Sequence, residues 1–219
     1  MSASKDLDVD AVIFDLDGVL IDSAAVIERH WRAWAERNGL AVSEVLRAIQ
    51  GRPAREAIQA LAPDLDGAAE VRRLQELEAR DGGGIRAAPG AHRLLLSIPT
   101  GRWAIVTSGT MEVARARLGY AGLPTPGVLV TADDVRRGKP APEGMLAAAA
   151  GLHVSPGRCV VLEDAPAGAA AARAAGMALI RVSPGGARSA GAGLQVSSLE
   201  QVEVELAGGA LRLRVRHPA

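Results

Sequence analysis

The stretch "AVIFDLDGVLIDS", residues 11–23, decides how the rest of the chain is interpreted. Its first four residues are apolar and predict a strand that is buried on both faces. Asp15 and Asp17 follow at once, two positions apart. Side chains at that spacing share a face of an extended segment, and close like charges raise each other's pKa. The stretch therefore predicts a cation site, a proton-transfer site, or both, at the end of a strand.

Short apolar runs of the same kind recur along the chain, at residues 103–108, 127–132, 159–164 and 178–182. Helical patterns at 110–123, 141–154 and 166–177 lie between them, and Gly151 and Gly176 are placed where C-caps belong. Alternating strands and helices predict an α/β fold, a Rossmann-like parallel sheet with helices on both faces.

One interval breaks this alternation. Between the first strand and Arg86 there is no apolar β run, and four segments, 24–40, 43–51, 53–63 and 67–84, have helical patterns. A single crossover rarely needs about 60 residues. We therefore predict an inserted all-helical cap domain, residues 23–87, in a discontinuous core of residues 1–22 and 88–219.

The tail has a strand pattern of its own. Residues 201–215 alternate in polarity on both sides of Gly208-Gly209, which predicts a hairpin.

Composition excludes several classes of partner. Basic and acidic residues both number 25, and aromatic residues make up 2% of the chain, so neither nucleic acid nor an anionic membrane is an expected partner. Cys159 is the one cysteine, which excludes an internal disulfide and favours a reducing compartment. No run approaches the roughly 18 apolar residues of a membrane span. We expect a cytoplasmic protein, with a monomer as the simplest state.

Polar residues follow the predicted strands, and the carboxyl ends of parallel strands are where ligands bind. They are Asp15, Asp17, Thr107, Ser108, Gly109, Lys139, Glu163 and Asp164. This set suits a phosphate ester. One carboxylate can attack phosphorus, a second can move a proton, and others can hold Mg²⁺, while a lysine, hydroxyls and an amide bind phosphoryl oxygens.

The segments "DLDGVLIDS" (15–23), "VTSGT" (106–110), "GKPAPE" (138–143) and "VLEDAPAGAAAARAAGM" (161–177) resemble the four motifs of haloacid dehalogenase superfamily phosphatases. Their order and spacing match over residues 10–183, and the helical interval resembles that family's cap. Within the family, the motifs resemble most closely those of sugar- and polyol-phosphate phosphatases, glycerol phosphate phosphatases among them.

The resemblance implies a Mg²⁺-dependent phosphomonoester hydrolase that acts on a small phosphorylated metabolite through an aspartyl-phosphate. Asp15 is then the nucleophile, Asp17 the general acid and base, and Lys139 the catalytic cation, expected as the only one near the acids. The implied phosphate-binding residues are Thr107, Ser108, Gly109 and Lys139, with Arg52 of the cap for the distal part of the substrate. The implied Mg²⁺ ligands are Asp15, Asp17 through its carbonyl, and Asp164, with Glu163 as a direct or water-mediated ligand.

Three other functions share part of this pattern. A β-phosphoglucomutase-like phosphomutase has the same core motifs but carries a cap histidine where this chain has Ile27. Haloacid dehalogenases lack the second acid, which is present here as Asp17. A receiver-type phosphoacceptor module gathers similar side chains but takes its phosphorylated aspartate from a middle strand and has no helical insert. The phosphomutase stays as the alternative.

Overall fold

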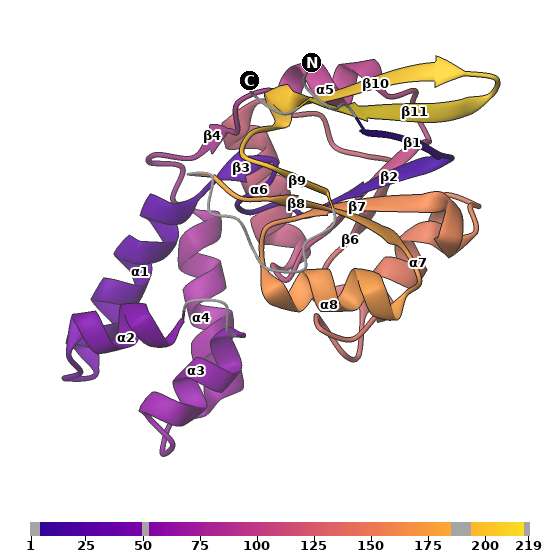
Figure 1. The fold of residues 1–219 in the computed structure, drawn as a ribbon. Helices are drawn as coiled ribbons and strands as arrows, with labels where there is room; N and C mark the ends of the chain where they lie inside the picture. Colours follow the sequence, from indigo (N-terminus) through magenta and orange to yellow (C-terminus); the bar gives the residue numbers. More distant parts are fainter. Residues whose placement is uncertain (1–4, 50–52, 185–193, 217–219) are drawn as a thin grey trace.

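The structure, a computed structural model, describes residues 5–49, 53–184 and 194–216. Its centre is a parallel sheet with the strand order β6-β5-β2-β7-β8-β9 (Figure 1). The strands are β2 (Ala11–Phe14), β5 (Trp103–Val106), β6 (Val128–Val130), β7 (Cys159–Glu163), β8 (Ala178–Val182) and β9 (Leu194–Val196). All the apolar runs predicted as strands are in this sheet. The short strand β9 was not predicted.

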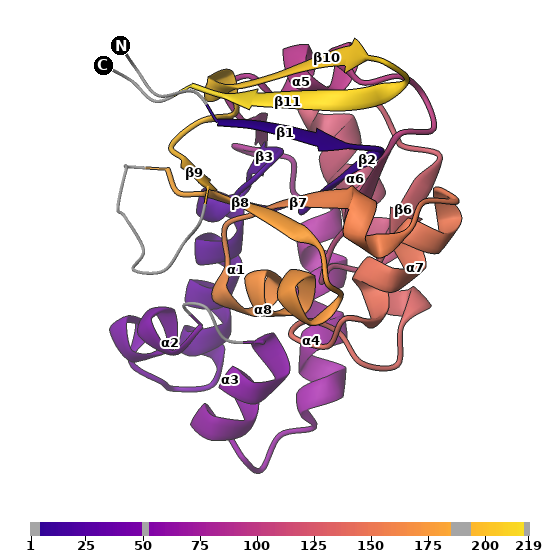
Figure 2. The same ribbon diagram turned by 45° about the vertical axis from the view of Figure 1, so that its right-hand side comes forward.

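Helices cover both faces of this sheet, as predicted. Alternate residues of β2 face opposite sides, so that Ile13 belongs to one apolar cluster and Phe14 to another. Helices α7 (Glu143–Gly151) and α8 (Pro166–Ala174) pack on the Ile13 side. Helices α5 (Ala91–Ser97) and α6 (Met111–Ala121) pack on the Phe14 side. Figure 2 shows α7 and α8 together on one side of the sheet.

The predicted C-cap at Gly151 is wrong. Helix α7 includes Gly151, and its C-cap is Leu152. A Cβ on Gly151 would lie 3.0 Å from a methyl carbon of Val128, so the glycine allows the helix to approach β6. Gly176 does follow the C-cap of α8, with a φ of 73°.

Four helices form a separate group, and in the chain they come between the two segments that make up the core. They are α1 (Ala24–Arg37), α2 (Val42–Ala48), α3 (Ala54–Leu61) and α4 (Gly67–Ala79), called here the helical insert. Trp31 and Trp34 of α1 pack edge to face and lie in a core of the insert's own, with Ile58 and Leu74. The insert lies to one side of the sheet in Figure 1.

The chain enters and leaves the insert through a short antiparallel pair that was not predicted. Strand β3 (Ile21–Asp22) pairs with β4 (Arg86–Ala87). The two connecting segments are therefore held side by side where the insert joins the core.

The tail forms the predicted hairpin. Strands β10 (Val202–Ala207) and β11 (Ala210–Val215) are joined at Gly208-Gly209, both with positive φ. An unpredicted N-terminal strand, β1 (Lys5–Val9), completes a three-stranded antiparallel sheet. Leu7 and Val9 of β1 pack on the core, while its acids pair with arginines of β11.

Within the described residues, none of the helices combines the length and the apolar character that crossing a membrane requires.

Candidate active site

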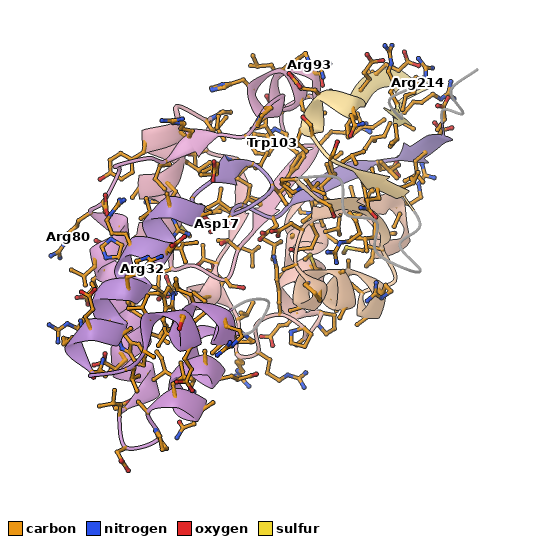
Figure 3. The ribbon with its side chains drawn as sticks, turned by 60° about the vertical axis from the view of Figure 1, so that its left-hand side comes forward. Asp17, Arg32, Arg80, Arg93, Trp103 and Arg214 are labelled. Atoms are coloured by element: carbon orange, nitrogen blue, oxygen red, sulfur yellow. The ribbon has the colours of Figure 1, made fainter. Side chains whose placement is uncertain are left out.

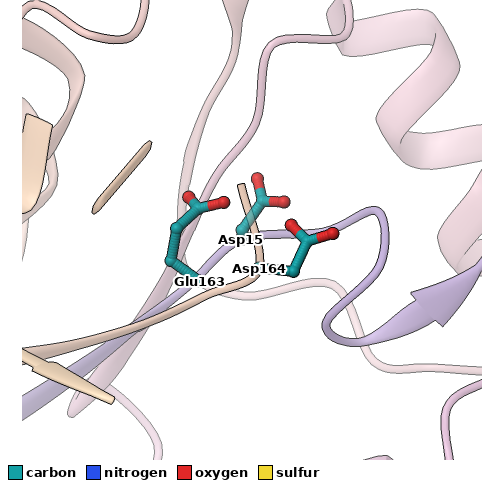
Figure 4. Close-up of side chains that lie close together, drawn as sticks. All are labelled: Asp15, Glu163 and Asp164. Atoms are coloured by element: carbon teal, nitrogen blue, oxygen red, sulfur yellow. The ribbon is translucent and has the colours of Figure 1, made fainter. Parts of the chain in front are cut away.

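Three carboxylates meet at the carboxyl edge of the sheet. Asp15 follows β2, whereas Glu163 ends the neighbouring strand β7 and Asp164 follows it. One carboxylate oxygen from each lies within 4.8 Å of the others (Figure 4). Adjacent parallel strands end at the same edge, which is why residues nearly 150 positions apart become neighbours.

Lys139 places a positive charge between two of these acids. Its Nζ donates to Asp15 Oδ1 at 2.6 Å and to Glu163 Oε2 at 2.8 Å. Burial opposes the charge on this ammonium, but the two carboxylates outweigh burial and raise the pKa of Lys139. Lys139 is therefore a protonated, fixed cation beside Asp15.

One lysine does not neutralise three acids. Burial, and then the charge of Glu163, raise the pKa of Asp15 to about 7 despite the contact with Lys139. Burial and the charge of Asp15 raise the pKa of Asp164 to about 6. Burial also raises the pKa of Glu163. A bound divalent cation would favour the ionised forms, and an all-oxygen donor set suits a hard cation.

The three acids differ in what they still offer such a cation. Both oxygens of Glu163 are engaged, Oε2 by Lys139 and Oε1 by the N–H of Ala165 at 3.0 Å, and the side chain is fully buried. All three acids line the cavity, but only Oδ1 of Asp15 is used by Lys139. The geometry favours Asp15 and Asp164 as direct ligands, with Glu163 holding Lys139 in place.

Two glycines let the backbone approach these acids. A Cβ on Gly18, whose φ is 80°, would lie 2.2 Å from Asp164 Oδ2. A Cβ on Gly168 would lie 1.8 Å from Glu163 Oε2. Both glycines are inside the quoted motifs, but no role was predicted for either. The sequence feature that could have indicated them is a glycine at a turn or at the start of a helix, next to a motif of acidic residues.

Three of the residues predicted to bind phosphate, Thr107, Ser108 and Gly109, lie directly after β5. Thr107 is buried, and its Oγ1 accepts the N–H of Gly109 at 3.1 Å. Ser108 is exposed and lines the cavity. Phosphate binding by the Gly109 amide stays a prediction, because this N–H donates to Thr107 in the structure. Arg52 lies outside the described residues.

Asp17 lines the same cavity, but its carboxylate contacts residues outside the cluster of three acids. Its Oδ1 accepts from Ser23 Oγ at 2.6 Å, and its Oδ2 accepts from Arg117 Nη1 of α6 at 2.5 Å. Arg117 Nη2 in turn donates to Glu78 Oε2 of α4 at 2.6 Å. The expectation that Lys139 is the only cation near the acids is therefore wrong. Arg117 occupies a position on the apolar stripe of its helix, four residues after Val113, and that was the signal for it.

A cavity of about 910 Å³ lies between the sheet edge and the helical insert. Such a volume suits a small-molecule ligand. The sheet edge contributes Asp15, Asp17, Ser108, Lys139 and Asp164, and the insert contributes Ile27, Arg55, Glu56, Val71 and Gln75. The acids therefore form one wall of a cavity whose opposite wall is helical.

Comparisons with known proteins agree with this geometry. A family model described as haloacid dehalogenase-like hydrolase matches residues 9–176. The chain is 49% identical over 178 residues to hexitol phosphatase A of Escherichia coli (strain K12), covering 78% of this chain and 81% of that protein. It is 35% identical over 188 residues to glycerol-1-phosphate phosphohydrolase 2 of Saccharomyces cerevisiae, covering 80% and 75%. Among solved structures, a putative beta-phosphoglucomutase from Thermotoga maritima has a TM-score of 0.66 and 30% identity, covering 88% and 95%.

Proposed function

This chain belongs to the haloacid dehalogenase-like hydrolase family, and from that premise we propose that it is a phosphatase for small phosphorylated sugars or polyols. One observation carries the proposal. Asp15 is buried at the wall of a ligand-sized cavity, with the Lys139 ammonium at 2.6 Å and two further acids beside it. A carboxylate held by a fixed cation next to a metal-binding group is arranged to attack a phosphoryl group.

In the first step, a carboxylate oxygen of Asp15 forms a bond to phosphorus and the bond from phosphorus to the ester oxygen breaks. Asp17 gives its proton to that oxygen, so that the leaving group departs as an alcohol. Lys139 and Ser108 hold the phosphoryl oxygens as negative charge moves onto them. The products of this step are the alcohol and an aspartyl-phosphate on Asp15.

In the second step, water attacks the phosphorus of the aspartyl-phosphate. The Asp17 carboxylate takes a proton from that water, and the bond from phosphorus to Asp15 breaks. Inorganic phosphate leaves, Asp15 is a carboxylate again, and Asp17 carries the proton needed for the next first step. Asp17 is thus regenerated without an outside reagent.

We propose Mg²⁺ as the cofactor. Asp15 and Asp164 would hold it with carboxylate oxygens and Asp17 with its backbone carbonyl, while Glu163 supports the site through Lys139. When bound, Mg²⁺ supplies positive charge that offsets repulsion between the acids and the substrate phosphate. The raised pKa values of Asp15 and Asp164 support this proposal, because burial and repulsion between the acids disfavour their charged forms, which a cation between them would stabilise.

The helical insert is proposed to act as a cap that closes over the substrate. Its support is the cavity, which is lined by Arg55, Glu56 and Gln75 of the insert opposite the acids. These polar side chains are suited to contact the hydroxyl groups of a sugar or polyol. We further propose that the enzyme is cytoplasmic, as its single cysteine suggested, and that it is a monomer, the simplest state.

A phosphomutase is the alternative, and a solved structure with that name is similar to this chain. The curated relatives at 49% and 35% identity are both phosphatases. Ile27, at the position of the mutase histidine, is apolar and lines the cavity. An apolar side chain cannot take part in proton transfer there, which favours net hydrolysis.

The proposal is tested by phosphate release with Mg²⁺ across hexitol phosphates, hexose phosphates, glycerol 1-phosphate and phosphoglycolate. We expect the highest kcat/KM for a hexitol or glycerol phosphate. Conversion of β-glucose 1-phosphate to glucose 6-phosphate, without phosphate release, would show a mutase instead. Absence of release from every ester, by a folded protein with Mg²⁺, would refute the proposal.

Metal binding should stabilise the fold in a pH-dependent way. The pKa values of Asp15 and Asp164 rise from 3.8 to about 7 and about 6, so the metal-free fold is favoured by these groups at low pH. That contribution is lost as the pH rises from about 4 through 7, because the folded state then has to hold buried carboxylates that repel one another. At pH 8, Mg²⁺ at ten times its Kd should add about 1.4 kcal/mol, or roughly 3–5 °C in Tm. The rise should be smaller at pH 5.5.

Asp164→Asn tests the ligand assignment in the same melts. The variant should show a smaller Mg²⁺-induced rise in Tm at pH 8 than the wild type, because one charged ligand is gone. In EDTA it should be at least as stable as the wild type, because repulsion with Asp15 is relieved. Equal Mg²⁺-induced shifts in the two proteins would exclude Asp164 from the metal site.

A further inference from the structure

We propose that Arg117 is a positioning residue for Asp17, and that Glu78 of the helical insert is the counter-ion that fixes Arg117. The inference rests on the proposed function, in which Asp17 donates and accepts the proton. It adds a core arginine and an acid of the insert to the groups on which the reaction depends. Neither residue belongs to the motifs from which the site was predicted.

The contacts leave Asp17 little freedom. Each carboxylate oxygen has its own donor, Ser23 Oγ at 2.6 Å and Arg117 Nη1 at 2.5 Å. The other terminal nitrogen of Arg117 is held by Glu78 at 2.6 Å. Because a guanidinium is planar and rigid, fixing one of its ends by Glu78 also fixes the direction of the other. The orientation of the Asp17 carboxylate is therefore set by this arrangement.

Stability alone is a poor reason for an arginine at this position. The Arg117 side chain is 4% exposed, and its Nε has no hydrogen-bond partner among the described residues. Neighbouring residues on the same face of α6 are apolar, Val113, Ala114 and Leu118. A buried ion pair is costly to desolvate, and apolar residues of similar volume often replace one without loss. The cost is explained if the charge serves Asp17.

The arrangement spans the junction of the two parts of the molecule. Arg117 comes from α6 of the core, Ser23 from the segment that enters the insert, and Glu78 from the last turn of α4. Figure 3 shows Asp17 where the insert meets the sheet. The orientation of the proton donor thus depends on how α4 packs against α6.

The test compares two substrates whose leaving groups differ in their need for a proton. A positioning role for Arg117 affects only one of them, whereas a folding defect affects both. For Arg117→Met, kcat/KM is measured on glycerol 1-phosphate, or another alkyl phosphate that the wild type cleaves, and on 4-nitrophenyl phosphate. This parameter includes only steps through formation of the aspartyl-phosphate. An alkoxide needs the proton of Asp17, whereas a nitrophenolate leaves without it. We expect a loss of about 30-fold or more on the alkyl ester and less than about 3-fold on the aryl ester.

Two further variants control for stability. Arg115→Met removes an exposed arginine from the same helix and should leave both kcat/KM values unchanged. Arg117→Met leaves Glu78 buried without its cation and should lower Tm by roughly 10 °C. Arg117→Met combined with Glu78→Gln should recover most of that Tm. The double variant should still show the selective loss on the alkyl ester, because Asp17 still lacks its donor.

Four results are decisive. Equal losses on both esters, or recovery of the alkyl ester rate in the double variant, would make Arg117 a structural residue and overturn the inference. Unchanged rates on both esters in Arg117→Met would also overturn it. A wild type that cleaves neither ester, nor any other phosphate monoester, would refute the proposed function itself.

Discussion

Asp15→Asn is expected to reduce phosphate release by at least about 10⁴-fold while the protein stays folded. An amide cannot attack phosphorus. Glu163 also contacts Lys139 and lines the cavity, but its side chain is fully buried and both of its oxygens are engaged, so it is poorly placed to replace Asp15. Asparagine keeps the volume of the side chain, and its oxygen can still accept from Lys139. The loss should appear equally on alkyl and aryl phosphates, because both require the nucleophile.

The stability of Asp15→Asn tests the charge of Asp15 independently of its role in the reaction. The pKa of Asp15 is about 7, so at pH 8 the wild type holds a charge close to Glu163 that the variant lacks. In EDTA at pH 8, Tm of the variant should therefore equal or exceed that of the wild type. Asp64→Asn, at an exposed loop position, is the matched control and should change neither rate nor Tm. Phosphate release near the wild-type rate by purified Asp15→Asn would exclude it as the nucleophile.

Gly168→Ala is expected to have the second-largest effect, on both activity and stability. The new Cβ would lie 1.8 Å from Glu163 Oε2 and 2.1 Å from its Cδ. Glu163 is fully buried and hydrogen-bonded to Lys139 and the N–H of Ala165, so any movement of its side chain disturbs these bonds. Either α8 or Glu163 must shift. We expect a loss of about 3 kcal/mol, roughly 6–12 °C in Tm, and a fall in kcat of about 100-fold as Lys139 is displaced.

Gly119→Ala is the matched control, since Gly119 is also inside a helix, α6. A Cβ there meets nothing within 4 Å. Alanine should therefore stabilise the protein by about 0.5–1 kcal/mol, because glycine loses more backbone entropy on folding. In thermal melts, the change in Tm should be negative for Gly168→Ala and positive for Gly119→Ala. Only Gly168→Ala should lower kcat. A Gly168→Ala protein as stable and active as the wild type would show that Glu163 is not fixed as the structure has it.

The sequence alone determined five of the six strands of the parallel sheet, the helices of the insert and the identity of the acids. Strand β2 was predicted because four apolar residues in a row are typical of a strand covered on both faces. The four helices of the insert were predicted from their periodicity and from glycine and proline between them. The family resemblance named the residues of the sheet edge, and the structure gathers Asp15, Lys139, Glu163 and Asp164 there.

Weaker local patterns failed. Strand β1 was not predicted, because Asp6 and Asp8 give this segment the composition of a polar terminus. Its partners in β11 are also about 200 positions away in the chain. Paired with arginines of β11, these acids are suited to the solvent face of a strand. Gly151 was taken for a cap because its contact with Val128 is invisible in the sequence.

Only the tertiary structure decided what surrounds Asp17. Arg117 is 100 positions from Asp17 and 39 from Glu78, and nothing in the local pattern of any of the three indicates the others. A periodic pattern states which face of an element is buried, since that depends on neighbours along the chain. It does not state which buried groups meet, since that depends on how α4 and α6 pack. The chemistry of Asp17 was therefore predictable from the sequence, and its orientation was not.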